Sequence, residues 1–115
     1  MGYDVHITRA AEWSESESVP ISLAEWLDYV ANDPEMRLDN FAEAVVSGRV
    51  LRYENVGLAV WTSYPGRAAG GRPPWFDYRS GRVVVKNPDD MILDKMREIA
   101  SALDGRVVGD EGELY

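Results

Sequence analysis

The sequence predicts a single α+β domain over residues 1–115, with one mainly antiparallel sheet and two amphipathic helices on one of its faces. Three observations predict this class: two segments have helical apolar spacing, several have strand composition, and consecutive strands are joined by short turns. Strands joined in this way pair antiparallel. A chain of 115 residues is one domain in size and can bury a core without metal or disulfide support.

The first predicted strand covers residues 3–9, in which apolar and polar residues alternate. A period of two is typical of a half-buried strand. Residues 14–18, SESES, predict a polar loop after it. The alternation places Tyr3, Val5 and Ile7 on one face of the strand and Asp4, His6 and Thr8 on the other.

The first predicted helix begins at a capping box. Ser22 is the N-cap and Glu25 is the third helical residue. The helix should end near Asn32-Asp33, because Pro34 disfavours helical geometry in the residue before it. Its apolar stripe has the spacing i, i+3, i+4, i+7 and consists of Leu23, Trp26, Leu27 and Val30.

Residues 34–40 predict a loop or a single turn, and residues 41–46, FAEAVV, are open to two interpretations. Alanine and glutamate favour a helix. However, the two residues Ser47-Gly48 separate this segment from RVLRYE, a spacing that suits a hairpin turn. We therefore favour a strand, with a helix as the alternative.

Further strands are predicted over residues 49–54, 58–64, 75–79 and 82–86. The last two form a hairpin around Ser80-Gly81, which is the densest run of strand formers in the chain. Residues 65–74, PGRAAGGRPP, predict a loop. With the ambiguous residues 41–46 left out of the count, the order is β-α-β-β-β-β-α-β.

The second predicted helix has Asn87 as its N-cap, Pro88 at its first position and Gly105 just beyond its end. A final strand over residues 106–108 and a turning tail complete the chain. The apolar stripe of this helix consists of Ile92, Met96, Ile99 and Leu103.

Composition excludes several classes of protein. The absence of cysteine excludes disulfides, thiolate catalysis and cysteine-bound zinc, and a single histidine gives too few ligands to specify a metal site. We expect no cofactor and no metal. The chain begins without a signal-peptide pattern, and no apolar run could span a bilayer, so we expect a cytoplasmic protein without membrane contact.

The net charge of −8 is unevenly distributed. Residues 48–86 contain seven basic and two acidic residues, whereas both flanking regions are acidic. Because nucleic-acid binding requires clustered cations, we expect no nucleic-acid partner. The acidic flanks are typical of a solvated surface, and they would also speed association with a cationic protein.

Two short patterns could indicate a catalytic site or a phosphate site, but each has a simpler interpretation. Asp4 and His6 share a strand face, where a carboxylate could orient an imidazole as a general base. A hydrogen-bonded surface histidine is the simpler interpretation. The glycine-rich residues 66–72 resemble a phosphate loop, but no Lys-Ser/Thr pair and no helix follows them.

Exposed aromatic and arginine side chains give the strongest indication of a binding surface. Trp75, Asp77 and Arg79 should share the sheet face that the helices leave open, with Phe76 and Tyr78 on the other face. Aromatic and arginine side chains are enriched in interface cores. The alternative is that these residues complete the core edge or lie under the 65–74 loop. The candidate partner-binding residues are Trp61, Trp75, Asp77, Arg79, Arg52 and His6.

Several segments resemble a set of small bacterial proteins of uncharacterised function, over nearly the whole chain. They are YDVHITRAAEW, ISLAEWLDYVANDPEM, GLAVWT, WFDY with GRVVVKNPD, and GDEGELY. Some small acidic bacterial proteins of this kind are immunity proteins, which bind and neutralise a competitor's toxin domain. This analogy implies no particular site residues.

From these observations we expect a non-enzymatic binding protein, most concretely an immunity protein that occludes a basic toxin domain. Acidic residues would steer the partner, and exposed aromatics would supply affinity. Two alternatives are a domain that self-associates into a homodimer through its open face, and a small enzyme centred on Asp4 and His6 with Arg52 or Arg79 as anion binder.

Overall fold

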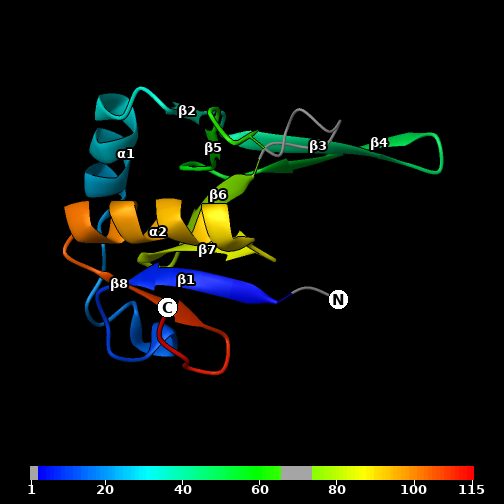
Figure 1. The fold of residues 1–115 in the computed structure, drawn as a ribbon. Helices are drawn as coiled ribbons and strands as arrows, with labels where there is room; N and C mark the ends of the chain where they lie inside the picture. Colours follow the sequence, from blue (N-terminus) through cyan, green and yellow to red (C-terminus); the bar gives the residue numbers. More distant parts are fainter. Residues whose placement is uncertain (1–2, 66–73) are drawn as a thin grey trace.

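The computed structural model describes residues 3–65 and 74–115, and its centre is a six-stranded antiparallel sheet of order β2-β5-β6-β7-β1-β8 (Figure 1). Both helices pack on one face of this sheet, which confirms the predicted α+β class. The elements are β1 (Asp4–Thr8), the 3₁₀ helix η1 (Trp13–Glu15), α1 (Leu23–Asn32), β2 (Met36–Leu38), β3 (Phe41–Val46), β4 (Arg49–Glu54), β5 (Ala59–Trp61), β6 (Trp75–Arg79), β7 (Arg82–Lys86), α2 (Asp90–Ala102) and β8 (Arg106–Gly109).

The core lies between the sheet and the two helices. Alternate residues of each strand enter it, as the period of two requires. Phe76 and Ile7 from the sheet and Trp26 from α1 are fully buried there. Trp26 also donates a hydrogen bond from Nε1 to the carbonyl oxygen of Gly57 at 2.7 Å, so its polar atom is satisfied inside the core.

The helix starts show one confirmed cap and one correction. Ser22 and Glu25 form the predicted capping box of α1. The N-cap of α2 is Asp89 instead of Asn87, because the Asp89 side chain accepts a hydrogen bond from the backbone N–H of Ile92. Asn87 has φ 50° and binds the backbone of Tyr3 through its side chain and its own N–H, so it ends β7.

The end of α2 differs from the prediction by one residue. Asp104 takes the left-handed conformation with φ 57°, and the N–H of Gly105 then bonds to the carbonyl of Ala100 at 2.8 Å. This is the Schellman arrangement of a helix end. A Cβ on Gly105 would lie 3.1 Å from the carbonyl oxygen of Thr8, so glycine allows close packing against β1 without displacing that carbonyl.

Between the helices the described residues contain six strands, whereas the predicted order had four. The segment over residues 34–40 was predicted as a loop, but Met36–Leu38 forms β2 and pairs with β5. Residues 41–46 form the favoured strand, and Ser47 and Gly48 have φ 52° and 76° in the turn that follows. Positive φ at both central residues is typical of a tight hairpin turn.

A buried lysine of α2 joins this helix to the end of α1. Nζ of Lys95 lies 2.8 Å from Asp33 at the end of α1, 3.1 Å from Glu35 and 2.8 Å from Glu98. Although burial favours the neutral amine, these three carboxylates raise the pKa of Lys95 overall. A lysine this buried requires such partners, so the network is part of the helix packing.

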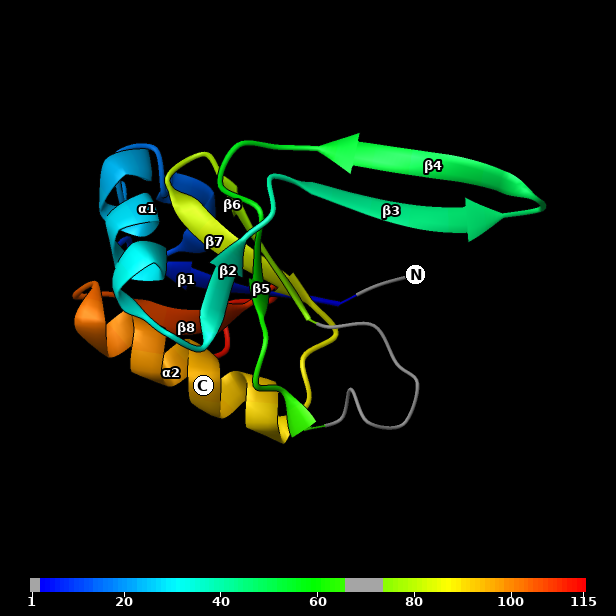
Figure 2. The same cartoon turned by 90° about the horizontal axis from the view of Figure 1, so that it is seen from above.

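The hairpin of β3 and β4, residues 41–54, extends away from the rest of the molecule, on the side of the sheet opposite α2 (Figure 2). We call it the ribbon. Among the described residues its strands pair only with each other, from Phe41 opposite Glu54 to Val46 opposite Arg49. None of the helices in the described part of the chain has the length and apolar character that a membrane crossing requires.

Candidate binding surface

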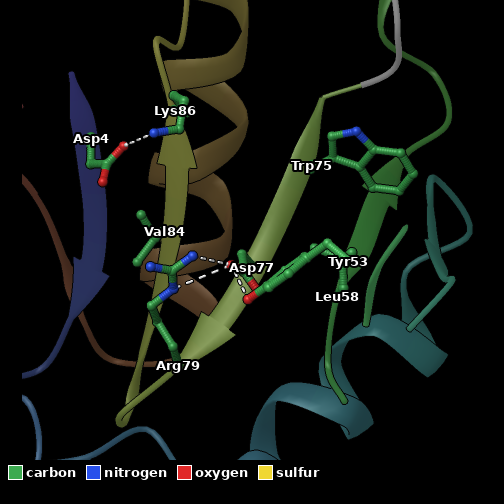
Figure 3. Close-up of a pocket in the computed structure, with 8 residues that line it drawn as sticks. All are labelled: Asp4, Tyr53, Leu58, Trp75, Asp77, Arg79, Val84 and Lys86. Carbon is green, nitrogen blue, oxygen red and sulfur yellow. Dashed lines mark hydrogen bonds and ion pairs between the residues drawn. The ribbon is translucent and has the colours of Figure 1, made fainter. Parts of the chain in front are cut away.

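A pocket of about 330 Å³ lies on the open face, meaning the sheet face opposite the helices (Figure 3). Its walls combine apolar side chains with two acidic and two basic ones, so it can take a partner side chain that is itself partly apolar and partly charged. It is lined by Asp4, Tyr53, Leu58, Trp75, Asp77, Arg79, Val84 and Lys86.

Strand register explains why these side chains meet. Asp77 lies opposite Val84, and Val84 lies opposite His6, so all three share the open face. Trp75 and Arg79 are two residues from Asp77 in either direction and therefore share that face too. Phe76 is fully buried on the helix side. The predicted division of the β6 residues between the two faces is therefore the one the structure has, but the open face is covered at Asp77, which is only 7% exposed.

Asp77 connects the pocket to the ribbon. Its carboxylate is buried, and it accepts hydrogen bonds from Arg79, from the Asn55 side chain and, at 3.1 Å, from the Tyr53 hydroxyl. The bonds to Asp77 raise the pKa of Arg79, and burial together with the same carboxylate raises the pKa of Tyr53. A carboxylate satisfied by three partners holds the base of the ribbon to β6.

The junction between ribbon and sheet is built from polar backbone contacts. Asn40, with φ 64°, accepts a hydrogen bond at its Oδ1 from the N–H of Gly57 at 3.1 Å. Asn55 donates from Nδ2 to the carbonyl of Tyr78 at 2.6 Å. Gly57 has φ 95°, and a Cβ there would lie 2.9 Å from Cβ of Tyr78. The ribbon therefore leaves the sheet through a defined bend.

The ribbon exposes large apolar side chains on both of its faces. One face carries Val45 and Val50 near the tip. The same face carries Arg52, which forms ion pairs with Glu43 and Glu54. We call the other the pocket-side face, because its Tyr53 lines the pocket. The exposed fractions are 66% for Val45, 51% for Val46, 64% for Val50, 55% for Leu51, 47% for Tyr53 and 61% for the neighbouring Val56.

This exposure is unusual because the residues are contiguous. Single exposed apolar residues need no explanation, but a continuous apolar surface on a soluble protein typically marks an interaction site. Leu51 and Val46 extend the apolar walls of the pocket, formed by Trp75 and Leu58, towards the ribbon tip. Pocket and pocket-side face thus form one surface.

His6 lies on the open face but away from this pocket. Its ring stacks on Trp13 with centroids 4.4 Å apart, and only 2% of the residue is exposed. Nε2 lies 2.8 Å from Asp110 Oδ1, and Nδ1 accepts a hydrogen bond from Arg82. The ring is therefore neutral with its proton on Nε2, and burial lowers the pKa of His6 more than Asp110 raises it.

This arrangement also differs from the Asp4–His6 pair considered from the sequence. Asp4 pairs with Lys86 at 3.5 Å, and the carboxylate that binds the imidazole belongs to Asp110. Asp4 and Arg79 line the pocket, whereas His6 is beneath Trp13 and Arg52 is on the ribbon. The groups that the enzyme alternative requires do not converge.

Two more candidate residues lie apart from the pocket. Trp61 is on the helix side, where its ring contacts Tyr64 and lies 5.9 Å from Nζ of Lys95. Arg52 covers the ring of Phe41 on the ribbon face turned away from the pocket. Of the six candidates, only Trp75, Asp77 and Arg79 are brought together.

Sequence reasoning missed Tyr53, Leu58 and the apolar side chains of the ribbon. A signal for the ribbon was present, because VV before the Ser47-Gly48 turn and VL after it place apolar residues on both faces of a two-stranded hairpin. In these pairs apolar and polar residues do not alternate, unlike in a strand that has one buried and one solvated face. The glycine-rich segment at residues 66–72, considered above as a phosphate loop, lies outside the described residues. Within the described residues, no group of three histidine, aspartate or glutamate side chains could hold a metal ion.

Comparisons with protein-family models, with curated proteins and with solved structures find no match for this chain.

Proposed function

We propose that this chain is a binding protein whose protein partner docks on the pocket and the pocket-side face of the ribbon. The observation that carries the proposal is the contiguous exposure of Val46, Leu51 and Tyr53 beside the Trp75 wall of the pocket. Large aromatic and aliphatic anchors next to a pocket are the usual energetic centre of a protein interface. The Asp77 contacts support this role because they orient the ribbon before a partner arrives.

The most concrete form of the proposal is an immunity protein that neutralises a basic toxin domain. Its support is the charge distribution. The ribbon has two acidic and two basic residues, and the pocket lining has the same balance, so the net charge of −8 resides outside both. Acidic surroundings would accelerate the approach of a cationic partner, while the neutral surface makes the contact.

The test is co-purification with the product of an adjacent gene, using the wild type, Leu51→Asp and the control Met91→Asp. Met91 is exposed to a similar degree, 53%, but lies on α2. We expect capture by the wild type and by Met91→Asp and loss with Leu51→Asp. The proposal is wrong if no neighbouring product is captured, or if Leu51→Asp captures it as well as the control does.

A further inference from the structure

We propose that the occupant of this surface, when no other protein is bound, is a second copy of this chain, with each ribbon tip seated on the other copy's pocket. The inference rests on the proposed function in treating pocket and ribbon as an interaction surface. It adds that the surface is self-complementary and that the site is complete only when the second copy supplies the tip.

Symmetry makes the arrangement reciprocal. A two-fold axis relates identical patches, so a contact from the tip of one ribbon to the base of the other occurs twice. The ribbon strands have six residues each, about 20 Å of extended chain. With the axis between Leu51 and Tyr53, the two pocket-side faces lie antiparallel. Leu51 then covers Tyr53 of the second copy, and the tip pair of Val46 and Arg49 reaches its pocket.

The side chains at the two ends of the ribbon match chemically. At the tip, Val46 lies directly opposite Arg49, and Arg49 makes no ion pair with the described residues. At the base, the pocket offers the apolar walls of Trp75 and Leu58, and beyond them the carboxylate of Asp4. Aliphatic tip and apolar wall thus meet, and the Arg49 guanidinium extends towards a carboxylate.

Asp4 is suited to this contact because its existing pairing is weak. Nζ of Lys86, at 3.5 Å, is its one ion-pair partner in the described residues, and the Lys86 side chain is 68% exposed. An exposed lysine held at this distance contributes little. The Asp4 side chain remains 28% exposed at the pocket, although its Oδ1 is buried. An arginine from a second copy can approach the exposed part of this side chain and add a charge-assisted hydrogen bond to its carboxylate.

Charge balance allows two acidic chains to meet at this place. The ribbon and the pocket lining are each neutral, although each copy has a net charge of −8. The remaining repulsion lies between the bodies and is screened by salt. Salt screens this long-range repulsion more than it screens the close Arg49–Asp4 contacts, so raising the salt concentration should strengthen the dimer. The opposite salt dependence is expected for binding to a basic partner, which gives a physical separation of the two occupants.

The first experiment measures the molar mass of the full chain by light scattering over a wide concentration range, at low and high salt. We expect a dimer that dissociates on dilution and a lower dissociation constant at high salt. Leu51→Asp should raise the dissociation constant by about a hundredfold, since it buries a charge at the centre of the interface. Met91→Asp should leave it unchanged. A wild type that stays monomeric throughout overturns the inference.

The second experiment tests the reciprocal contact by charge reversal. Arg49→Asp and Asp4→Arg should each weaken self-association by about tenfold, because each places like charges together at both contacts. Mixing the two variants should restore the dimer, since each mixed pair again has two opposite-charge contacts. Arg97→Asp, a change of a surface arginine on α2, is the matched control. Failure of the mixture to recover overturns the assignment of Arg49 to the pocket.

Circular dichroism and thermal unfolding of each variant identify loss of folding, which would otherwise imitate loss of the dimer. Failures of the two proposals are distinguishable. A monomeric wild type whose capture of a neighbouring gene product is lost with Leu51→Asp overturns self-pairing and leaves the proposed function intact. A dimer with restored pairing in the mixture but no captured partner supports self-pairing and overturns the immunity function.

Discussion

The six-stranded body and the ribbon are made from the same kind of strands, yet they are stabilised differently. In the body, alternate side chains such as Phe76 and Ile7 are fully buried under two helices. In the ribbon, Val45 and Val50 face each other across the strands and are mostly exposed. Burial of apolar side chains therefore stabilises the body. The ribbon is stabilised by its turn, its cross-strand pairs and the contacts at its base.

The largest expected effect separates the two regions by core truncation. Phe76→Ala should lower the free energy of unfolding by about 3–5 kcal/mol, because a fully buried aromatic is lost. Leu51→Ala in the ribbon should cost within about 0.5 kcal/mol, measured with monomeric protein. Urea unfolding followed by circular dichroism measures both. Similar losses at the two positions would mean that the ribbon is part of the cooperative core.

A smaller effect is expected from the buried lysine, which has no counterpart in the ribbon. Lys95→Met should cost about 2 kcal/mol, since the Asp33 side chain, 10% exposed, then loses its cation, although Glu35 and Glu98 can be solvated. The exposed pair of Arg97 and Asp94 gives the control, because Arg97→Met should have almost no effect. Equal unfolding midpoints for the two variants would contradict a structural role for Lys95.

The junction gives a prediction about coupling between the regions. Asp77→Asn removes the charge that Arg79, Tyr53 and Asn55 bind, and should cost about 1 kcal/mol. Hydrogen exchange should accelerate in the ribbon amides and stay unchanged in β1 and β7. Asp94→Asn serves as the control. If exchange in β7 accelerates to the same degree as in the ribbon, Asp77 supports the whole sheet instead of the ribbon base.

The smallest effect concerns pH and belongs to the body alone. The folded pKa of His6 is lowered, so the unfolded chain takes up a proton first, near the ordinary value of about 6.5. The stability that the neutral ring supplies is therefore complete above this pH and is lost as the pH falls below it. Protonation would also place two donors, Arg82 and Nδ1, against each other while Asp110 retains Nε2.

The check is a comparison of unfolding free energies between the wild type and His6→Gln from neutral to mildly acidic pH. The free energy of unfolding of the wild type should fall more than that of the variant over this pH range. Parallel pH profiles for the two proteins would contradict a contribution from His6 titration.

Local contacts were predictable from the sequence, and distant ones were not. The Ser22–Glu25 capping box and the Ser47-Gly48 turn depend on residues a few positions apart, and both are present. The predicted N-cap of α2 was wrong because the Asn87 side chain accepts a hydrogen bond from the backbone N–H of Tyr3, which is distant in the chain. The sharing of one face by Trp75, Asp77 and Arg79 followed from strand alternation alone.

The rest of the site depends on tertiary placement. Tyr53 meets Asp77 only because the ribbon bends at Asn40 and Gly57. Asp110 meets His6 only because β8 lies beside β1. Neither contact leaves a trace in local periodicity or composition, so no pattern in the sequence could have predicted them.

The position of β1 between β7 and β8 has a consequence for folding order. Strand β1 must wait for partners about 80 and 100 residues further along the chain, so during synthesis it remains unpaired until β7 and β8 are made. The hairpin of β3 and β4 needs only a two-residue turn and can close within microseconds. An exposed apolar hairpin can therefore close transiently before the sheet that supports it, and the contacts at its base then stabilise it once β6 is in place.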